Sequence, residues 1–350
     1  MNFIDADSHV LAANIFNYVE DSTVKGHLPN YIFGIDGRLQ PGSVEIDPNR
    51  SWNLNKLPLV GYNASGRTVI SKRLEHMETM GVDFQILNPD EQTLRFSYLV
   101  EPMIAREIAR CHNRSVLDIV KTHPDRFAAT LLLPLQDMDW SLDEMRWGKS
   151  QGFKSIVIDV CWPVAGSITS QPLADIPRLD DLFALAVELD MLVVLHQQSH
   201  KREIRSESHV KRYRLEKLYP TNFEVALVCL VTSGLLDRHP TVRILMAEGE
   251  EDFLAITLRH LRLLGYADAA ERLARNFLFT IETESTAMLM DNIRALGPDC
   301  FLFATDYPHN DPGGIGKWED ADNLRKLGLD ALAMEKIGRT NAIKAFALTI

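Results

Sequence analysis

Three short apolar runs, far apart in the chain, each end in a side chain that can bind a metal ion. The runs are residues 3–9 (FIDADSH), 192–196 (LVVLH) and 301–306 (FLFATD). A carboxylate or imidazole at the carboxyl end of a buried strand is where parallel α/β sheets and barrels display their reacting groups. Zinc, manganese and iron all accept imidazole nitrogens and carboxylate oxygens as ligands. The recurrence of this ending predicts a metal-dependent enzyme.

Strand-like and helix-like segments alternate along most of the chain. Strands are expected at residues 2–5, 84–87, 127–133, 155–158, 192–196, 243–247, 278–280 and 301–305. Helices are expected at residues 71–80, 103–122, 140–151, 179–189, 223–233, 251–265, 285–296 and 331–346. This alternation predicts an α/β fold, a distorted (β/α)8 TIM barrel. We expect one domain over residues 1–350, with a long insertion or lid at about residues 10–70.

An open, doubly wound sheet is the alternative architecture. Ligand-type residues end the first, fifth, sixth and eighth expected strands. Only closure of the sheet brings the first and eighth strands together, so the barrel is preferred.

Composition narrows the class of partner. The chain has 350 residues, of which 46% are hydrophobic and 24% charged, and its net charge is −11. This negative charge argues against nucleic acid or an anionic membrane as partner, and a small-molecule substrate is expected instead. The cysteines form no zinc-binding pattern, no signal-type segment is evident, and the longest apolar stretch is too short to span a bilayer. A cytoplasmic location is therefore expected.

Several motifs follow one another in a specific order. They are DADSHV (5–10), MGVDFQILNP (80–89), HPDRF (123–127), LPLQD (133–137), a strand ending in His196, RHPTVRI (238–244) and ATDYPH (304–309). Their order and spacing resemble the amidohydrolase superfamily, and within it the amidohydrolase-related branch that is typified by aminocarboxymuconate semialdehyde decarboxylase. The resemblance covers nearly the whole chain.

The resemblance implies a divalent metal ion at the carboxyl face of the barrel: zinc, manganese or iron, with one or two ions per chain. The first-strand ligands of the family are commonly two histidines, and Asp7 and His9 stand at the matching positions. His196 would be the fifth-strand ligand. Asp306 would bind the metal directly or hold a metal-bound water as general base. The added carboxylate favours the harder ions.

The sixth expected strand departs from the family. Better-known members place a histidine there, whereas we assign Glu248 to that position. Glu248 could bind a second metal ion, act as an acid or base, or orient the substrate. The missing histidine counts against decarboxylation, because related decarboxylases use it. The fourth strand ends in Ile158 and Asp159 without a lysine, so a carbamylated-lysine pair of metals is not expected.

Four further side chains are candidates in the loops that follow the fifth and eighth strands. His200 could assist catalysis, or could be an ordinary loop residue. Arg202 and Arg205 could bind a substrate carboxylate in a bidentate pair, or could belong to a solvated loop. His309 could bind substrate or stabilise the turn that contains it.

These residues lead us to expect a metal-dependent hydrolase that acts on a small, carboxylate-bearing organic substrate. A metal-activated water would attack, Asp306 would take its proton, and Glu248 or His200 would assist. Nonoxidative decarboxylation by a carboxy-lyase is the first alternative. An iron- or manganese-dependent oxygenase, and a structural partner subunit of an active paralogue, also remain open. The resemblance implies a homo-oligomer, with a hetero-oligomer containing a paralogue as the alternative.

Overall fold

The computed structural model describes residues 2–11, 18–20, 69–90, 93–94, 101–163, 169–196, 203–204, 222–248, 253–281, 286–308 and 319–350. Its parallel strands form one sheet in the order β1-β2-β3 and a second in the order β12-β11-β10-β8-β5-β4. Their bounds are β1 Phe3–Val10, β2 Val82–Pro89, β3 Phe127–Ala129, β4 Leu131–Leu132, β5 Ser155–Asp159, β8 Leu192–His196, β10 Ile244–Ala247, β11 Phe277–Ile281 and β12 Phe301–Phe303.

The two sheets are joined where β3 gives way to β4. These two segments are separated by Thr130 alone. The Thr130 N–H donates to the carbonyl of Leu87 on β2 at 3.1 Å, so the segment remains bonded to its neighbour on that side. On the other side, Leu131 and Leu132 of β4 pair with β5. The strand expected at residues 127–133 is therefore present, interrupted at one residue.

The remaining edges meet where β1 runs beside the segment that follows β12. Ser8 and Tyr307 form a parallel bridge, and the Asp306 N–H donates to the Asp7 carbonyl at 3.0 Å. These contacts complete a ring in which β3 and β4 share one of eight positions, and they confirm the predicted barrel. It is distorted, because the β1–β2 register shifts between Asp5 and Ser8.

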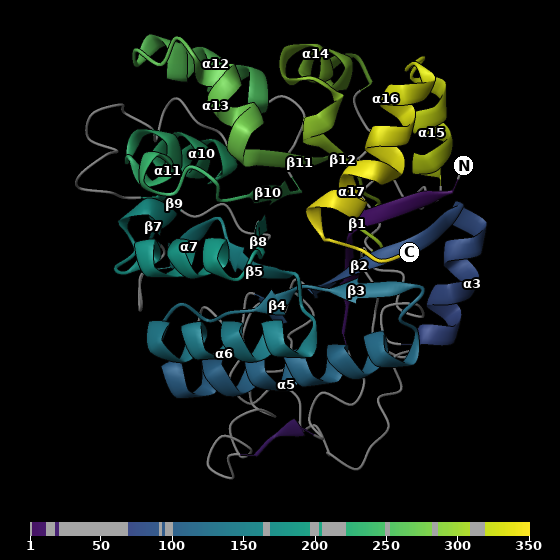
Figure 1. The fold of residues 1–350 in the computed structure, drawn as a ribbon, viewed down its shortest axis with the longest axis vertical. Helices are drawn as coiled ribbons and strands as arrows, with labels where there is room; N and C mark the ends of the chain where they lie inside the picture. Colours follow the sequence, from purple (N-terminus) through teal and green to yellow (C-terminus); the bar gives the residue numbers. More distant parts are fainter. Residues whose placement is uncertain are drawn as a thin grey trace.

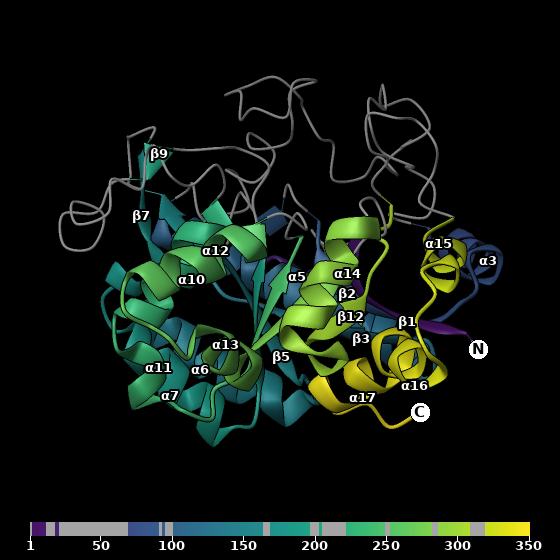
Figure 2. The ribbon, with the colours of Figure 1, turned by 90° about the horizontal axis from the view of Figure 1, so that it is seen from above.

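Helices lie around the outside of the strands (Figures 1 and 2). Their bounds are α3 Ile70–Met80, α5 Pro102–Thr122, α6 Met138–Gln151, α7 Leu179–Glu188, α10 Asn222–Thr232, α11 Leu235–Arg238, α12 Phe253–Leu263, α13 Ala269–Asn276, α14 Thr286–Leu296, α15 Asp320–Lys326, α16 Ala331–Glu335 and α17 Asn341–Ala345. A π-helical segment, Lys336–Thr340, interrupts the helix expected at residues 331–346. A small sheet, β6-β7-β9 (Cys161–Pro163, Thr169–Pro172 and Glu203–Ile204), stands apart from the barrel strands. None of the described helices is both long and apolar enough to cross a membrane.

The core explains why the barrel strands read as continuous apolar runs. All residues of β8, β10 and β12 are buried. A strand that faces side chains of the barrel interior on one side and helices on the other has no solvent-exposed face, so polar residues do not alternate along it. A polar residue near the carboxyl end of such a strand is then conspicuous, and the candidate site lies at these ends.

Candidate metal centre

Five potential metal ligands converge near the carboxyl ends of four barrel strands. Asp7 and His9 lie on β1, His196 is the last residue of β8, Glu248 follows β10, and Asp306 follows the β12 segment. Their ligand atoms form two overlapping groups, one of Asp7, His9 and His196 and one of His9, Glu248 and Asp306. Within each group the atoms lie within 4.8 Å of one another. The structure thus brings together five residues that are far apart in the sequence.

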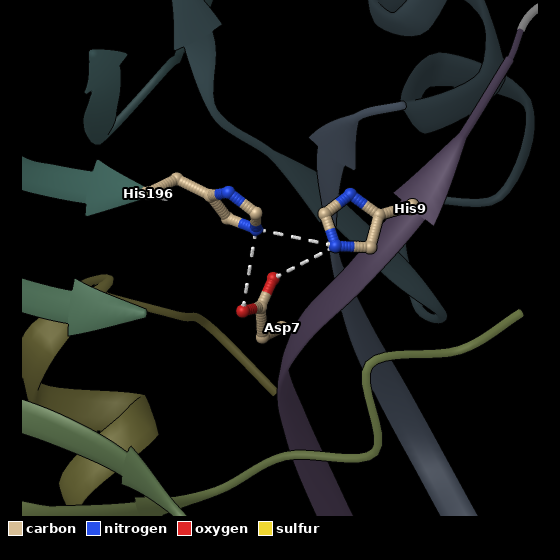
Figure 3. A group of neighbouring side chains, drawn as sticks. All are labelled: Asp7, His9 and His196. Carbon is tan, nitrogen blue, oxygen red and sulfur yellow. Dashed lines mark hydrogen bonds and ion pairs between the residues drawn. The ribbon is translucent and has the colours of Figure 1, made fainter. Parts of the chain in front are cut away.

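The two imidazoles meet edge to face through their Nε2 atoms, which are 3.2 Å apart (Figure 3). His9 Nδ1 lies 2.8 Å from the carbonyl oxygen of Pro89. A carbonyl oxygen only accepts hydrogen bonds, so Nδ1 carries the hydrogen and the Nε2 lone pair of a neutral His9 is directed toward the cluster. This is how ligating histidines are commonly oriented in metal sites.

Negative charge accumulates around His9 Nε2. Asp306 Oδ1 lies 2.9 Å from this nitrogen, Asp7 Oδ1 3.6 Å and Glu248 Oε1 3.7 Å. Burial lowers the pKa of His9, but its hydrogen bond with Asp306 and the charges of Asp306 and Asp7 outweigh burial and raise the pKa to about 9. The centre of the cluster therefore favours a positive charge, and a proton and a metal ion compete for this position.

Asp7 provides the test of whether the residues fit a metal. Its carboxylate is fully buried, and Oδ1 accepts a hydrogen bond of 2.6 Å from Asn88 Nδ2. Asn88 is held in turn by the Thr130 hydroxyl, which donates to Asn88 Oδ1 at 2.7 Å. Asp7 Oδ2 accepts no hydrogen bond from the described residues and lies 3.7 Å from His196 Nε2. A buried carboxylate oxygen without a donor is costly, and a bound cation would satisfy it.

Glu248 and Asp306 reach the cluster through unusual backbone conformations. Their φ angles are +63° and +50°, in the left-handed region that residues other than glycine seldom adopt. The Glu248 N–H donates to Thr280 Oγ1 at 3.1 Å, and the Asp306 N–H is bonded to β1. Strained residues of this kind persist where surrounding contacts fix them, and they gather at functional sites.

The pairing of β10 with β8 shows which residue of the sixth barrel strand lies level with His196. Ala247 is the direct partner of His196. Neighbouring partners project from the same face of a sheet, so the side chain level with the His196 imidazole is a methyl group. Glu248 comes one residue later and reaches the cluster through its left-handed turn.

A buried polar network supports β1 behind the cluster. Asp5 accepts hydrogen bonds from Gln85 Nε2 at 2.9 Å and from the hydroxyl and N–H of Thr305 at 2.6 and 3.0 Å. Burial raises the pKa of Asp5 to about 7, against the effect of these bonds. The fully buried Arg73 donates to Gln85 Oε1 at 2.9 Å and to the carbonyl of His9. The network therefore fixes the backbone that carries Asp7 and His9.

The sequence-based candidates divide into two groups. Asp7, His9, His196, Glu248 and Asp306 lie together. His200, Arg202, Arg205 and His309 lie outside the described residues. Asn88, Thr130 and Arg73 were missed. Asn88 lies near the end of β2 within the family-like motif 80–89, and its place beside a strand end was the available signal.

Fold and site together define a (β/α)8 barrel with imidazoles and carboxylates gathered at its carboxyl face. Residues 71–348 match the family model described as Amidohydrolase, and the chain belongs to this family, as its motifs predicted.

Curated relatives are decarboxylases. The chain is 27% identical over 298 residues to gamma-resorcylate decarboxylase of Rhodococcus jostii, a match that covers 79% of this chain and 87% of the relative. It is 23% identical over 186 residues to 2-amino-3-carboxymuconate-6-semialdehyde decarboxylase of Dictyostelium discoideum, covering 52% of this chain and 48% of that one. These relatives lie in the amidohydrolase-related branch.

A solved structure shares the fold over nearly its full length. It is a dihydroxybenzoic acid decarboxylase from Polaromonas sp., determined with bound manganese and the inhibitor 2-nitroresorcinol. The TM-score is 0.68 at 20% identity, and the match covers 99% of this chain and 98% of the other. At this identity the likeness supports the fold.

Proposed function

We propose that this chain is a metal-dependent nonoxidative decarboxylase that acts on a small hydroxylated carboxylic acid. The single observation that carries the proposal is the cluster of Asp7, His9, His196 and Asp306, in which a buried Asp7 oxygen lacks a donor among the described residues. The family and its decarboxylase relatives give the cluster its chemistry. They favour decarboxylation over the hydrolysis that the sequence first suggested.

Asp7, His9 and His196 would hold the ion, with Asp306 at the more open side. The side chains of the first three are fully buried, whereas that of Asp306 is 8% exposed. A mixed set of carboxylates and imidazoles suits manganese, iron or zinc. Such an ion would bind the carboxylate and a neighbouring hydroxyl oxygen of the substrate and stabilise negative charge that develops on them.

Asp306 is suited to carry the proton. Its Oδ1 lies 2.9 Å from His9 Nε2, and its side chain is 8% exposed, whereas that of His9 is 0% exposed. In its neutral form it would give a proton to the substrate carbon that bears the carboxylate, after which the bond to that carboxylate breaks. The new C–H bond takes its electron pair from the π system of the substrate, the pair of the broken C–C bond restores that π system as carbon dioxide leaves, and the ionised Asp306 recovers a proton from water.

The direct test is a substrate screen with metal-loaded protein. Protein reconstituted with manganese is incubated with a panel of hydroxybenzoates, including 2,6-dihydroxybenzoate, and carbon dioxide release is measured beside amide and ester substrates. We expect release from at least one hydroxybenzoate, its abolition by a chelator, and its loss in Asp306→Asn. Turnover confined to the amides or esters would support hydrolysis instead and would refute the proposal.

A further inference from the structure

We infer that Glu248 is a fifth protein ligand of the metal ion, bound in the resting enzyme and displaced when substrate binds. The inference rests on the proposed function, because it assumes that the cluster holds an ion.

The distances place Glu248 around the same centre as the two imidazoles. Its Oε1 atom lies 3.5 Å from His196 Nε2 and 3.7 Å from His9 Nε2. Ligand atoms that are each about 2.1 Å from one ion are separated by about 3.0 Å at octahedral angles and about 3.4 Å at tetrahedral angles. The observed separations exceed the octahedral value by no more than about 0.7 Å, so a small movement of the Glu248 side chain would bring Oε1 into the coordination shell.

The two ligand groups describe one ion rather than two. They share His9, whose Nδ1 donates to the Pro89 carbonyl and whose Nε2 has a single lone pair. His9 can therefore bind one ion only. A second ion about 3.5–4 Å away would have to be held without His9 Nε2. Asp7, His196, Glu248 and Asp306 accordingly surround the ion that His9 binds.

The local backbone indicates that Glu248 is held toward the centre. Ala247, the last residue of β10, is level with His196 and faces the site, so a straight continuation of the strand would direct the next side chain to the opposite face. The φ of +63° at Glu248 reverses this direction, and Thr280 fixes the turn through the Glu248 N–H. A carboxylate that merely filled space would not require this strained conformation.

The number of ligands explains why Glu248 must be displaced. Five protein ligands leave one position on a six-coordinate ion, whereas a substrate that binds through two oxygens needs two. The Glu248 side chain is 22% exposed, compared with 0% for Asp7 and 8% for Asp306, so it has the most room to move. Its departure also removes a negative charge beside an incoming anionic carboxylate, which lowers the repulsion between site and substrate.

Manganese binding to Glu248→Gln, which keeps the size of the side chain but removes its charge, tests the inference. Glu248→Ala is the second variant, and Glu271→Gln, an exposed position on α13, is the matched control. Free manganese is measured by electron paramagnetic resonance to obtain Kd, and the spectrum of bound manganese is recorded with and without 2-nitroresorcinol. Thermal unfolding without metal verifies that each variant folds.

We expect both Glu248 variants to bind one manganese ion about tenfold or more weakly than the wild type, with an altered resting spectrum. With 2-nitroresorcinol bound, the wild-type and Glu248→Gln spectra should become alike, and Glu271→Gln should match the wild type throughout. Wild-type affinity and resting spectra in both Glu248 variants would overturn the inference while leaving the proposed function intact. A wild-type protein that binds no manganese would overturn both.

Discussion

Replacing Asn88 by alanine tests whether the orientation of Asp7 sets the affinity for metal. Asn88 Nδ2 donates to Asp7 Oδ1 at 2.6 Å in a fully buried setting, and Thr130 holds the asparagine. The variant removes this donor and leaves Asp7 free to rotate between alternative positions. The other Asp7 oxygen, which would face the ion, is then no longer fixed.

The expected magnitude follows from the kind of bond that is lost. A hydrogen bond to a buried charged group contributes about 1.5–3 kcal/mol. If about 2 kcal/mol of this acts on the orientation of Asp7, manganese Kd rises about 30-fold, since each 1.4 kcal/mol is a factor of ten. Removal of groups that support metal ligands typically lowers metal affinity by roughly 10–100-fold, and the expected rise in Kd lies within this range.

The assay is a manganese titration followed by calorimetry, with Asn276→Ala as the matched control. Asn276 is also buried and donates to the carbonyls of Pro240 and Val242, but it contacts no residue of the cluster. We expect Asn276→Ala to lower the unfolding free energy and leave manganese Kd unchanged. If Asn88→Ala binds manganese as tightly as the wild type although it unfolds more easily, the reasoning about Asp7 is refuted.

Substitutions at His196, Asp306 and Arg73 test the roles of metal ligand, proton donor and structural support separately. His196→Ala should bind manganese at least about 100-fold more weakly, because it removes an imidazole ligand, and equilibrium dialysis would show this; undiminished binding would remove His196 from the site. Asp306→Asn should lower kcat by about 10²–10⁴-fold with metal still bound, because the amide cannot supply the proton. A kcat near the wild-type value would exclude Asp306 as the proton donor. Arg73→Met should lower the free energy of unfolding by about 3 kcal/mol, measured by urea denaturation, because it leaves Gln85 Oε1 and the His9 carbonyl without their buried donor. A decrease below about 0.5 kcal/mol would show that the network does not support β1.

The barrel could be predicted because its strands are buried on both faces. Apolar runs separated by helical periodicity locate such strands well, and the polar residues at their ends identified all five clustered residues as candidates. The predicted first strand, however, ended at Asp5, whereas β1 continues to Val10. The polar residues of this stretch resemble a loop in sequence, and only pairing with β2 and the β12 segment makes them a strand.

The supporting residues could not be predicted because their contacts depend on the folded register. Asn88 reaches Asp7 through the pairing of β1 with β2, and Arg73 reaches the His9 carbonyl from α3, 64 residues away in sequence. Neither contact can be inferred from the spacing of residues along the chain. The direction of the Glu248 side chain could not be predicted either, because it is set by the left-handed conformation of Glu248 itself rather than by the strand before it.

Metal content measured by plasma mass spectrometry shows whether the cluster of imidazoles and carboxylates binds an ion. Wild-type protein and His196→Ala are reconstituted with manganese, freed of excess ion by gel filtration and compared. We expect one ion per chain in the wild type and almost none in the variant. A wild-type chain that retains no metal, or a His196→Ala variant that retains a full equivalent, would contradict this expectation.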